Sequence, residues 1–593
     1  MKYTILTLCG ALLLFTSVQA YADEYRLTIA REAVNITGKT VEKITINGGI
    51  PGPTLRFKEG EDVTIHVTNK MDEDTSVHWH GLLLPGEMDG VPGFNGFPGI
   101  KPEETFTYHF KTRQSGTYWY HSHSMGQEQD GHYGSIVITP KQDTVNADRD
   151  YVVLLSDYTD EESSGILANL KMSSDYYAYA RRTIGDFFTD AKEKGFSKAW
   201  KTATMWSKMR MMPTDLSDVS GYTFLINGQT PDQNWTGLFK AGERVRLRFI
   251  NASAMSFYDV RIPGLKMQVV AADGQDVEPV TVDEFRFGVA ETYDVIVTPK
   301  ENKAYTIAAE SIDRSGFAIG TLAPRAGMKT AVPEHRLRAL LTMADMGMDM
   351  QMGHDMGNMD HSKMTPEEMA EMRVEMESGW AKAGTPQGNK QLNYSDLRYL
   401  NTQEDLRQPE REILVRLGGN MERYIWTMNG KKYADAGPMK LNYGERVRLK
   451  FVNDTMMAHP MHLHGMFTQL ENGQPMFKLP NKHTVIVPPG QSYSVLLTAD
   501  EAGEWAFHCH LLYHMAAGMM TKAVVAKLDP SDIPDYAKAA PYKPSSASKP
   551  MSDHSKMGHN TMKKDMPDMK AMDHSKMNHG TNTTTQGEHN HAH

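Results

Sequence analysis

The chain has 593 residues, of which 40% are hydrophobic, and a formal net charge of -10. These values indicate a soluble globular protein of about three to four domains. The charge is spread along the chain with no basic stripe, so a nucleic-acid partner is not expected. Only two cysteines occur, Cys9 and Cys509, which leaves little room for a disulfide framework.

The first 22 residues have the pattern of a cleaved secretory signal. One lysine precedes an apolar run, and small residues follow it, ending at Ala22. The run is shorter than the ~20 residues that a membrane span needs, so a retained anchor is the weaker alternative and no membrane insertion is expected. No twin arginine precedes the run, and we therefore expect export to the periplasm by the general secretion route. Cleavage would leave Cys509 as the only cysteine.

One pattern recurs three times along the chain. It reads GEDVTIHVTN at 60–69, GERVRLRFIN at 242–251 and GERVRLKFVN at 444–453, and an Asn-Gly pair precedes each copy at 47–48, 227–228 and 429–430. Alternation after Gly-Glu predicts a half-buried strand, and Asn-Gly predicts a tight turn. We interpret the copies as three related β-sandwich domains in an all-β protein. The alternative is that alternating strands simply resemble one another.

The copies suggest a division of the chain. We expect a signal peptide at 1–22, a first domain at 23–145, a second at 146–330, a Met-rich linker at 331–392, a third domain at 393–530 and a disordered Met/His-rich tail at 531–593. The second domain has an insertion at about 160–216 whose composition suits helices. Histidine motifs follow the first and third copies but not the second, so the middle domain is predicted to be a spacer.

Paired histidines are the main chemical signal. Alternate residues of a strand point to one face, so each His-x-His motif presents two imidazoles together. Four such motifs supply eight potential metal ligands. The alternative is that these histidines are simply polar residues on solvated strands. The pairs are His78 and His80, His121 and His123, His462 and His464, and His508 and His510.

Cys509 lies between two of these histidines and must therefore face the opposite side of its strand. His514 follows five residues later. His459 lies an odd number of residues before His462 and can lean to the same side, although Pro460 makes the local geometry uncertain, and Met519 is available as a weak axial thioether. Two imidazoles, one thiolate and a distant methionine describe a blue-copper electron-transfer site. An electron received there would cross one residue of backbone to His508 or His510. The alternative is a buried structural cysteine.

With these motifs the chain resembles the multicopper oxidases, and specifically the copper-resistance protein A family. HWHG, HSH, HPMHLHG and HCHLLYHMAAGM carry the resemblance. It implies three cupredoxin-like Greek-key domains and four copper ions, with one-electron oxidation at the type 1 copper and reduction of dioxygen to water at a trinuclear cluster. The implied type 2 ligands are His78 and His462. The implied type 3 ligands are His80, His121, His123, His464, His508 and His510, and the type 1 ligands are His459, Cys509, His514 and Met519.

Proton supply in this family involves acidic residues near the cluster. Asp89, in GEMDG, matches one such position and is a candidate catalytic residue, although it could equally be a turn aspartate. A second position, directly after His514, holds glutamate in other members but Met515 here. The sequence therefore leaves a second proton relay in doubt.

The methionines cluster outside the predicted domains. Residues 343–376 contain eleven of the 41, and the words MDHSKM and MSDHSKM recur in the tail. Such polar segments, poor in aromatic residues, are expected to be disordered. Thioether sulfur selects Cu(I) and imidazole adds sites for Cu(II), so we expect extra copper to bind there. A general metal-scavenging tail is the alternative.

Three functions remain open on the sequence. The first is a periplasmic copper-tolerance oxidase that converts Cu(I) to Cu(II) with dioxygen. The second is a laccase-like oxidase of phenols or catechols, and the third is a copper-sequestering protein. The expected partners are dioxygen, Cu(I) or a small reducing substrate, and other periplasmic copper-handling proteins, and the expected state is a monomer.

Overall fold

The structure is a computed structural model that describes residues 23–527 apart from 125, 180, 210–211, 339, 343–344, 346–379 and 381–383. The predicted signal peptide, most of the Met-rich linker and the whole tail lie outside the described residues. Among the described residues, no helix is both long and apolar enough to cross a bilayer.

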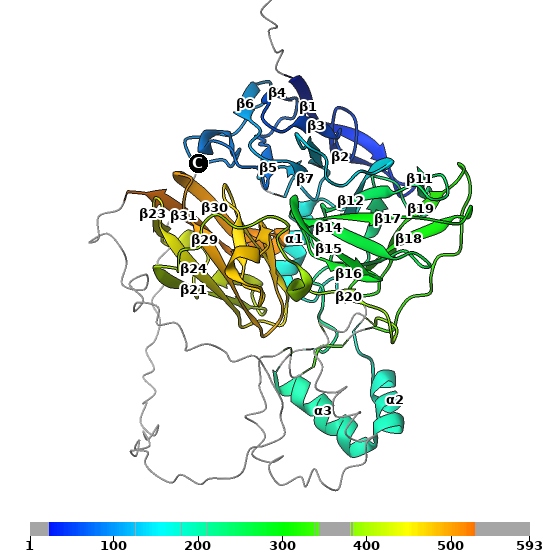
Figure 1. Ribbon diagram of the computed structural model, residues 1–593. Coiled ribbons are helices and arrows are strands. Elements are labelled where there is room, and N and C mark those ends of the chain that lie inside the picture. Colours follow the sequence, from blue (N-terminus) through cyan, green and yellow to red (C-terminus); the bar gives the residue numbers. More distant parts are fainter. Residues whose placement is uncertain are drawn as a thin grey trace, which may run out of the picture. The chain divides into compact units, whose positions relative to one another are not determined.

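Strands dominate the described chain and form six sheets, two for each of three sandwiches (Figure 1). In the first sandwich, one sheet has the order β2-β1-β4-β6 and the other β3-β8-β7-β5. The strands are β1 Asp23–Asn35, β2 Thr40–Ile46, β3 Leu55–Lys58, β4 Asp62–Asn69, β5 His78–His80, β6 Thr105–Lys111, β7 Gly116–His121 and β8 Tyr133–Thr139.

The second sandwich has sheets of order β10-β9-β12-β17-β14-β15 and β11-β19-β18-β13-β16-β20. Its strands are β9 Arg149–Tyr158, β10 Thr223–Ile226, β11 Trp235–Leu238, β12 Val245–Asn251, β13 Tyr258–Arg261, β14 Met267–Ala272, β15 Gln275–Val282, β16 Glu284–Phe287, β17 Thr292–Val297, β18 Tyr305–Ser311, β19 Phe317–Ala323 and β20 Gln391–Leu392. The helices α1 Ser163–Met172, α2 Ile184–Lys194 and α3 Phe196–Met209 lie in the predicted insertion.

The third sandwich has sheets of order β22-β21-β24-β29-β26-β27 and β23-β31-β30-β25-β28. Its strands are β21 Arg411–Asn420, β22 Ile425–Met428, β23 Met439–Asn442, β24 Arg446–Asn453, β25 His459–Leu463, β26 Thr468–Leu470, β27 Asn481–Lys482, β28 Thr484–Val487, β29 Ser492–Thr498, β30 Gly503–Cys509 and β31 Met520–Ala526. A short helix, α5 Leu512–Ala516, follows β30. The 3-10 turns given for the described residues are Gly86–Met88 in the first sandwich, Tyr394–Asp396 before the third, and Tyr433–Asp435 and Met476–Lys478 within the third.

The sequence pattern that recurs three times forms the same strand, with the same pairing, in each sandwich. The recurring segments form β4, β12 and β24, and each pairs in parallel with the first strand of its own sandwich, β1, β9 or β21. The Asn and Gly of all three preceding pairs have positive φ, as a type I′ turn requires. The all-β class with three cupredoxin-like domains is thereby confirmed.

One expectation about these strands is wrong. β4 alternates between buried and partly exposed residues as predicted, but every residue of β12 is buried. The reason is that Arg246 and Arg248 of β12 both pair with Asp294 of the neighbouring strand β17. Arg248 Nη1 also donates to Thr117 Oγ1 of the first sandwich at 2.9 Å. Arginine therefore marks an interface between domains here and not a solvated face.

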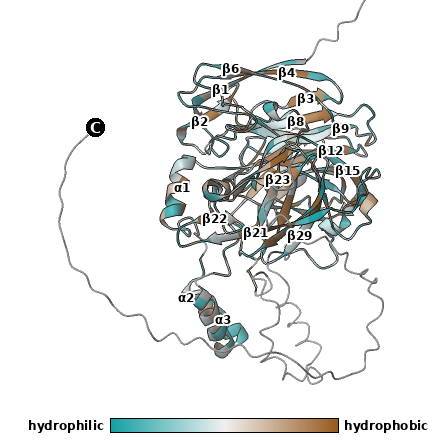
Figure 2. Cartoon of the chain, turned by 90° about the vertical axis from the view of Figure 1, so that its left-hand side faces the viewer, coloured by the Kyte–Doolittle hydropathy of each residue, from teal (hydrophilic) through white to brown (hydrophobic). Residues whose placement is uncertain are grey.

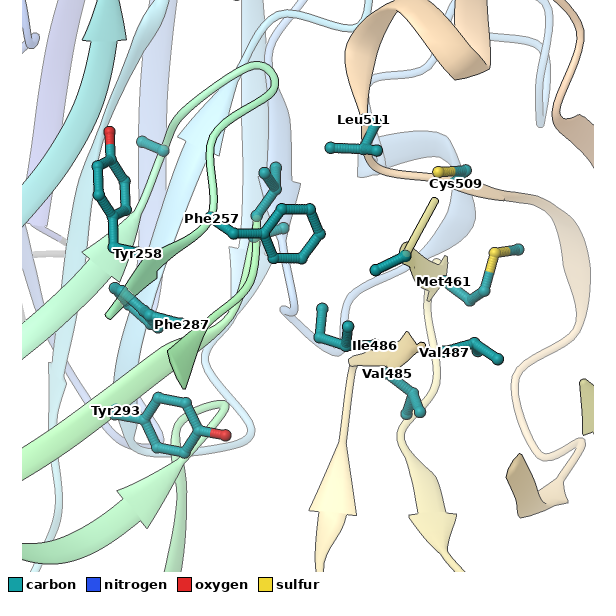
Figure 3. Packing of buried hydrophobic residues seen from close by; sticks show 14 of the residues in the cluster. Phe257, Tyr258, Phe287, Tyr293, Met461, Val485, Ile486, Val487, Cys509 and Leu511 are labelled. Atoms are coloured by element: carbon teal, nitrogen blue, oxygen red, sulfur yellow. The ribbon is translucent and has the colours of Figure 1, made fainter. Parts of the chain in front are cut away.

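The second and third sandwiches share a hydrophobic core. One cluster of buried residues runs through both, whereas most of the first sandwich packs around a separate cluster. Figure 3 shows Phe257 of the second sandwich directed toward Ile486 and Leu511 of the third. Figure 2 shows apolar residues along the strands of the sandwiches and both apolar and polar residues on α2 and α3. This shared core holds the middle domain against the strand that carries Cys509.

Candidate metal centre

Two strand ladders carry the histidine motifs. In the first sandwich, β5 pairs antiparallel with β7 so that His78 lies opposite His121. In the third, β25 pairs with β30 so that His462 lies opposite His508 and Met461 lies opposite Cys509. Alternation along β30 therefore sends His508 and Cys509 to opposite faces. Each ladder places its imidazoles on one face, because the two histidines of a His-x-His motif are two residues apart and alternate residues of a strand share a face.

The two ladders meet, and all eight paired histidines converge. The rings of His78 and His464 stack with centroids 3.8 Å apart, as do those of His80 and His462. His508 Nε2 lies 3.2 Å from His464 Nε2 and 3.4 Å from His123 Nε2. Seven of the eight side chains are buried and His123 is nearly so. Half of the cluster thus comes from the first sandwich and half from the third.

Several of the outward ring nitrogens of this histidine cluster are held by protein oxygens, whereas both ring nitrogens of His510 lack a partner among the described residues. The Nδ1 atoms of His78, His462 and His508 contact the carbonyl oxygens of Asp89, His483 and Cys509 at 2.9, 2.7 and 3.0 Å. His121 Nδ1 lies 2.9 Å from Glu128 Oε2. The nitrogens left without a polar partner among the described residues include His78 Nε2, His80 Nδ1, His121 Nε2, His462 Nε2 and His510 Nε2. Buried nitrogens without partners are costly, and a metal would satisfy them.

Burial also fixes the protonation of these rings. It lowers the pKa of His80, His121, His123, His462, His464 and His510, and neighbouring imidazoles lower it further. The pKa of His508 falls to about 4, chiefly through burial. A neutral imidazole is the form that binds a metal. The cluster is therefore ready to bind metal at neutral pH.

Asp89 lies against the cluster and is buried. Its Oδ2 is 2.9 Å from His464 Nδ1 and its Oδ1 is 3.3 Å from His78 Nδ1. One carboxylate thus contacts a histidine from each sandwich. A turn aspartate with no further role would not need this placement.

Cys509, His459 and His514 form a second group on the other face of β30, and all three are buried. Cys509 Sγ lies 3.5 Å from His459 Nδ1 and 3.8 Å from His514 Nδ1, and the two nitrogens are 3.2 Å apart. One ion could touch all three atoms at usual metal–ligand distances of about 2.0 to 2.3 Å. Met519 is fully buried, and its carbonyl accepts a hydrogen bond from the Cys509 N–H at 3.0 Å.

The outward nitrogens of this cysteine group are held by side chains. His459 Nε2 lies 2.7 Å from Thr455 Oγ1, and His514 Nε2 lies 2.7 Å from Asp218 Oδ2. Trp426 stacks on His514 with centroids 3.9 Å apart. Burial raises the pKa of the Cys509 thiol, so a metal would have to displace its proton. A Cys and two His with a methionine nearby is a donor set that suits copper.

The chain matches the multicopper oxidase family in three consecutive segments, at residues 28–143, 149–332 and 406–529. It belongs to the multicopper oxidases. Copper is thus the metal that the family implies, with dioxygen and a reducing substrate as reactants.

Curated relatives of this oxidase include proteins named for copper resistance. It is 49% identical over 562 residues to Copper resistance protein A of Escherichia coli, covering 85% of this chain and 92% of that protein. It is 50% identical over 550 residues to a Copper resistance protein A homolog of Pseudomonas syringae pv. tomato, with the same coverage. The resemblance to that family is therefore confirmed.

Solved structures of multicopper oxidases share the fold. Fet3p, described as a multicopper oxidase that functions in iron import, aligns with a TM-score of 0.63 at 20% identity, covering 88% of this chain and 93% of that one. A laccase from Botrytis aclada aligns with a TM-score of 0.60 at 22% identity, covering 85% and 87%. At these identities the likeness establishes the architecture alone.

Sequence reasoning missed several polar residues that contact the two groups. The middle domain lacks histidine, yet its Asp218 holds His514 and its Asp273 accepts hydrogen bonds from the backbone N–H groups of His483 and Thr484 beside His80. The domain is therefore more than a spacer. Neither aspartate stands in a motif, because both reach the centre through contacts between domains. His483 lies outside every His-x-His pair, so no motif in the sequence pointed to it.

Proposed function

We propose that this multicopper oxidase is a periplasmic enzyme of copper tolerance that oxidises Cu(I) to Cu(II). The observation that carries the proposal is the placement of Cys509 between the histidine cluster and the cysteine group. Its side chain belongs to one group, while its neighbours His508 and His510 belong to the other. The covalent path between the two groups is therefore one residue long.

We assign four copper ions to the two groups. His459, Cys509 and His514, with Met519 as axial partner, would hold the type 1 ion. His78 and His462 would hold the type 2 ion, and the type 3 pair would be held by His80, His121, His123, His464, His508 and His510. The inward-facing nitrogens without partners support this assignment. Bound copper supplies one-electron oxidation of the substrate and the reduction of dioxygen, so that four Cu(I), one dioxygen and four protons give four Cu(II) and two waters.

Side chains of the protein orient the histidines that are proposed to bind copper. Asp218 and Thr455 orient the two type 1 histidines, and Asp89 orients His78 and His464. We assign Asp89 the further role of passing protons to the cluster. The variant Asp89→Asn should retain copper but lose most turnover, whereas unchanged turnover would remove Asp89 from the reaction.

The copper-resistance relatives and the Met-rich segment at 343–376 support Cu(I) as substrate, and the N-terminal signal pattern supports the periplasm. The direct test measures oxygen uptake by the fully copper-loaded protein with chelator-stabilised Cu(I). We expect uptake well above the protein-free rate. Uptake at the background rate with every site loaded would reject the proposal.

Laccase-like oxidation of phenols is the second candidate, because type 1 sites accept many donors. Deleting residues 343–376 separates the two: Cu(I) oxidation should fall while phenol oxidation persists or rises. Copper sequestration is the third candidate. Cys509→Ser removes the thiolate through which electrons pass, so full protection of cells by this variant would favour storage over oxidation.

A further inference from the structure

His80 is oriented differently from its partners in the histidine cluster. Its Nδ1 faces inward without a partner, and its Nε2 faces outward. The outward Nε2 lies 3.2 Å from His483 Nδ1 and 3.3 Å from Thr484 Oγ1, all of them buried. His78, His121, His462, His464 and His508 instead have Nδ1 held by oxygen atoms. His80 therefore depends on a contact of its own.

The chemistry of imidazole fixes the direction of that contact. If Nδ1 of His80 binds a metal, the ring proton is on Nε2 and needs an acceptor. His483 Nδ1 can accept only when its own ring is neutral and protonated on Nε2. Asp273 Oδ2, at 3.5 Å from the same Nδ1, is too distant to take this nitrogen as a donor.

His483 is itself fixed by the middle domain. The backbone N–H groups of His483 and Thr484 both donate to Asp273 Oδ2 at 3.1 Å. Asp273 Oδ1 pairs with the buried Lys482 at 3.1 Å, and Lys482 reaches Glu291 Oε1 at 2.7 Å. Two carboxylates and one ammonium buried together make this a rigid anchor, because moving any of them would leave a buried charge unpaired.

The first domain also makes room for His483. Gly81, the glycine of HWHG, has φ of +81°, and a Cβ there would lie 2.6 Å from His483 Cδ2. No side chain other than hydrogen fits this position without displacing the ring. The three domains therefore meet at His483, which contacts His80 from one side and Asp273 from the other.

We propose that His483 is a positioning residue that accepts the His80 Nε2 proton and so turns His80 Nδ1 toward the cluster. The inference rests on the proposed copper centre. His80, His462 and His483 are also close enough together to hold an ion. His483 Nδ1 is engaged by His80 and Thr484, whereas its Nε2 is buried without a partner among the described residues. We favour positioning on the Nδ1 contacts, and the copper count below tests ligation through Nε2.

The test compares His483→Asn, whose amide oxygen can occupy the Nδ1 position, with His483→Leu, which removes the acceptor. Copper content and the electron paramagnetic resonance signal are measured after full loading, because a coupled pair of cupric ions is silent in that signal. In the wild type, two of the four proposed cupric ions should give a signal, because the other two form a silent coupled pair. We expect His483→Leu to bind four ions as well, but the number that gives a signal should rise from two toward four. His483→Asn should resemble wild type. His132→Leu, which removes a buried histidine beside Thr75, is the matched control.

Three results would overturn the inference. Wild-type spin silence in His483→Leu would show that His80 needs no such acceptor. Loss of one copper ion in the same variant would make His483 a ligand. Equal disruption by His483→Asn and His483→Leu would point to packing and not to the hydrogen bond. If His483→Leu fails to fold, Thr484→Val and His483→Asn are compared instead. A wild-type protein without a spin-silent pair would contradict the proposed copper centre itself.

Discussion

Asp218 is the residue through which the middle domain touches the cysteine group. Its Oδ2 contacts His514 and also accepts a hydrogen bond from the Tyr424 hydroxyl at 2.6 Å. Burial raises the pKa of Asp218 to about 7, and the Tyr424 hydrogen bond opposes that rise. A carboxylate beside a metal-bound imidazole strengthens the ligand and favours the higher oxidation state of the metal. Asp218 would therefore tune a metal ion bound by His514.

At a pH above about 7, where the Asp218 carboxyl is charged, Asp218→Asn should raise the reduction potential of the proposed type 1 copper. Its visible absorption should stay in place, because the charge is lost but the proposed ligands remain. Redox titration of the visible band measures the shift. Asp215→Asn is the matched control, since burial also raises the pKa of Asp215 to about 7 in the same segment. An equal shift in both variants would show a general field effect and not the His514 contact.

The sequence identified the histidine and cysteine motifs that converge in the structure better than it identified the residues that hold them in place. His-x-His pairs and a cysteine between histidines are readable because strand alternation is a local rule. Asp218 and His483 were missed because their roles depend on which domains touch, and no local pattern encodes that. Asp89 was identified only by family resemblance, and its two imidazole contacts became visible in the structure.

At the scale of elements, β12 shows how far strand patterns can be read. Its alternation predicts a half-buried strand, but Arg246 and Arg248 are both buried. They lie in a buried pair with Asp294, whose Oδ1 accepts a hydrogen bond from Thr117 at 2.7 Å. A charge pattern alone cannot distinguish a solvated face from a buried ionic interface.

Arg248→Met should destabilise the protein by about 3 kcal/mol, because it leaves part of the Asp294 charge uncompensated in a buried site. Chemical denaturation of the copper-free protein measures the change. Arg416→Met, which breaks the exposed pair with Asp454, is the control and should cost less than about 1 kcal/mol. Similar small losses in both variants would mean that the β12 pair adds nothing to the interface.

At the scale of the whole molecule, the histidine cluster lies at the interface between the first and third domains. Each contributes four imidazoles, and no covalent segment other than the middle domain and its linkers connects them. A metal bound by both domains stabilises only the folded arrangement, so its binding free energy adds to folding. Copper bound by the histidine cluster would therefore stabilise the fold as well as take part in the reaction.

Removing copper with a chelator should lower the thermal unfolding midpoint, and reloading should restore it. Scanning calorimetry of both forms measures the difference, which should shrink in His462→Gln because one proposed ligand from the third domain is lost. Identical midpoints with and without copper would show that the two domains are held by protein contacts alone.

The copper-free protein should lose stability as the pH falls below about 6.5, the usual pKa of histidine. Folded-state pKa values of the cluster are lowered, so the unfolded chain binds more protons in this range and acid favours it. Each such imidazole costs about 1.4 kcal/mol per pH unit until its folded pKa is reached. Denaturation at pH 7.5 and 5.5 measures the loss, and equal stability at both would contradict buried neutral rings.

The proposed function depends on the Cys509 thiolate, which would bind copper and pass electrons to the histidine cluster. The visible absorption spectrum of the purified, copper-loaded protein tests it most directly. We predict an intense blue thiolate-to-copper charge-transfer band that disappears on reduction, returns with dioxygen and is absent from Cys509→Ser. A fully loaded wild-type protein without this band, or one whose band fails to return with dioxygen, would contradict the account.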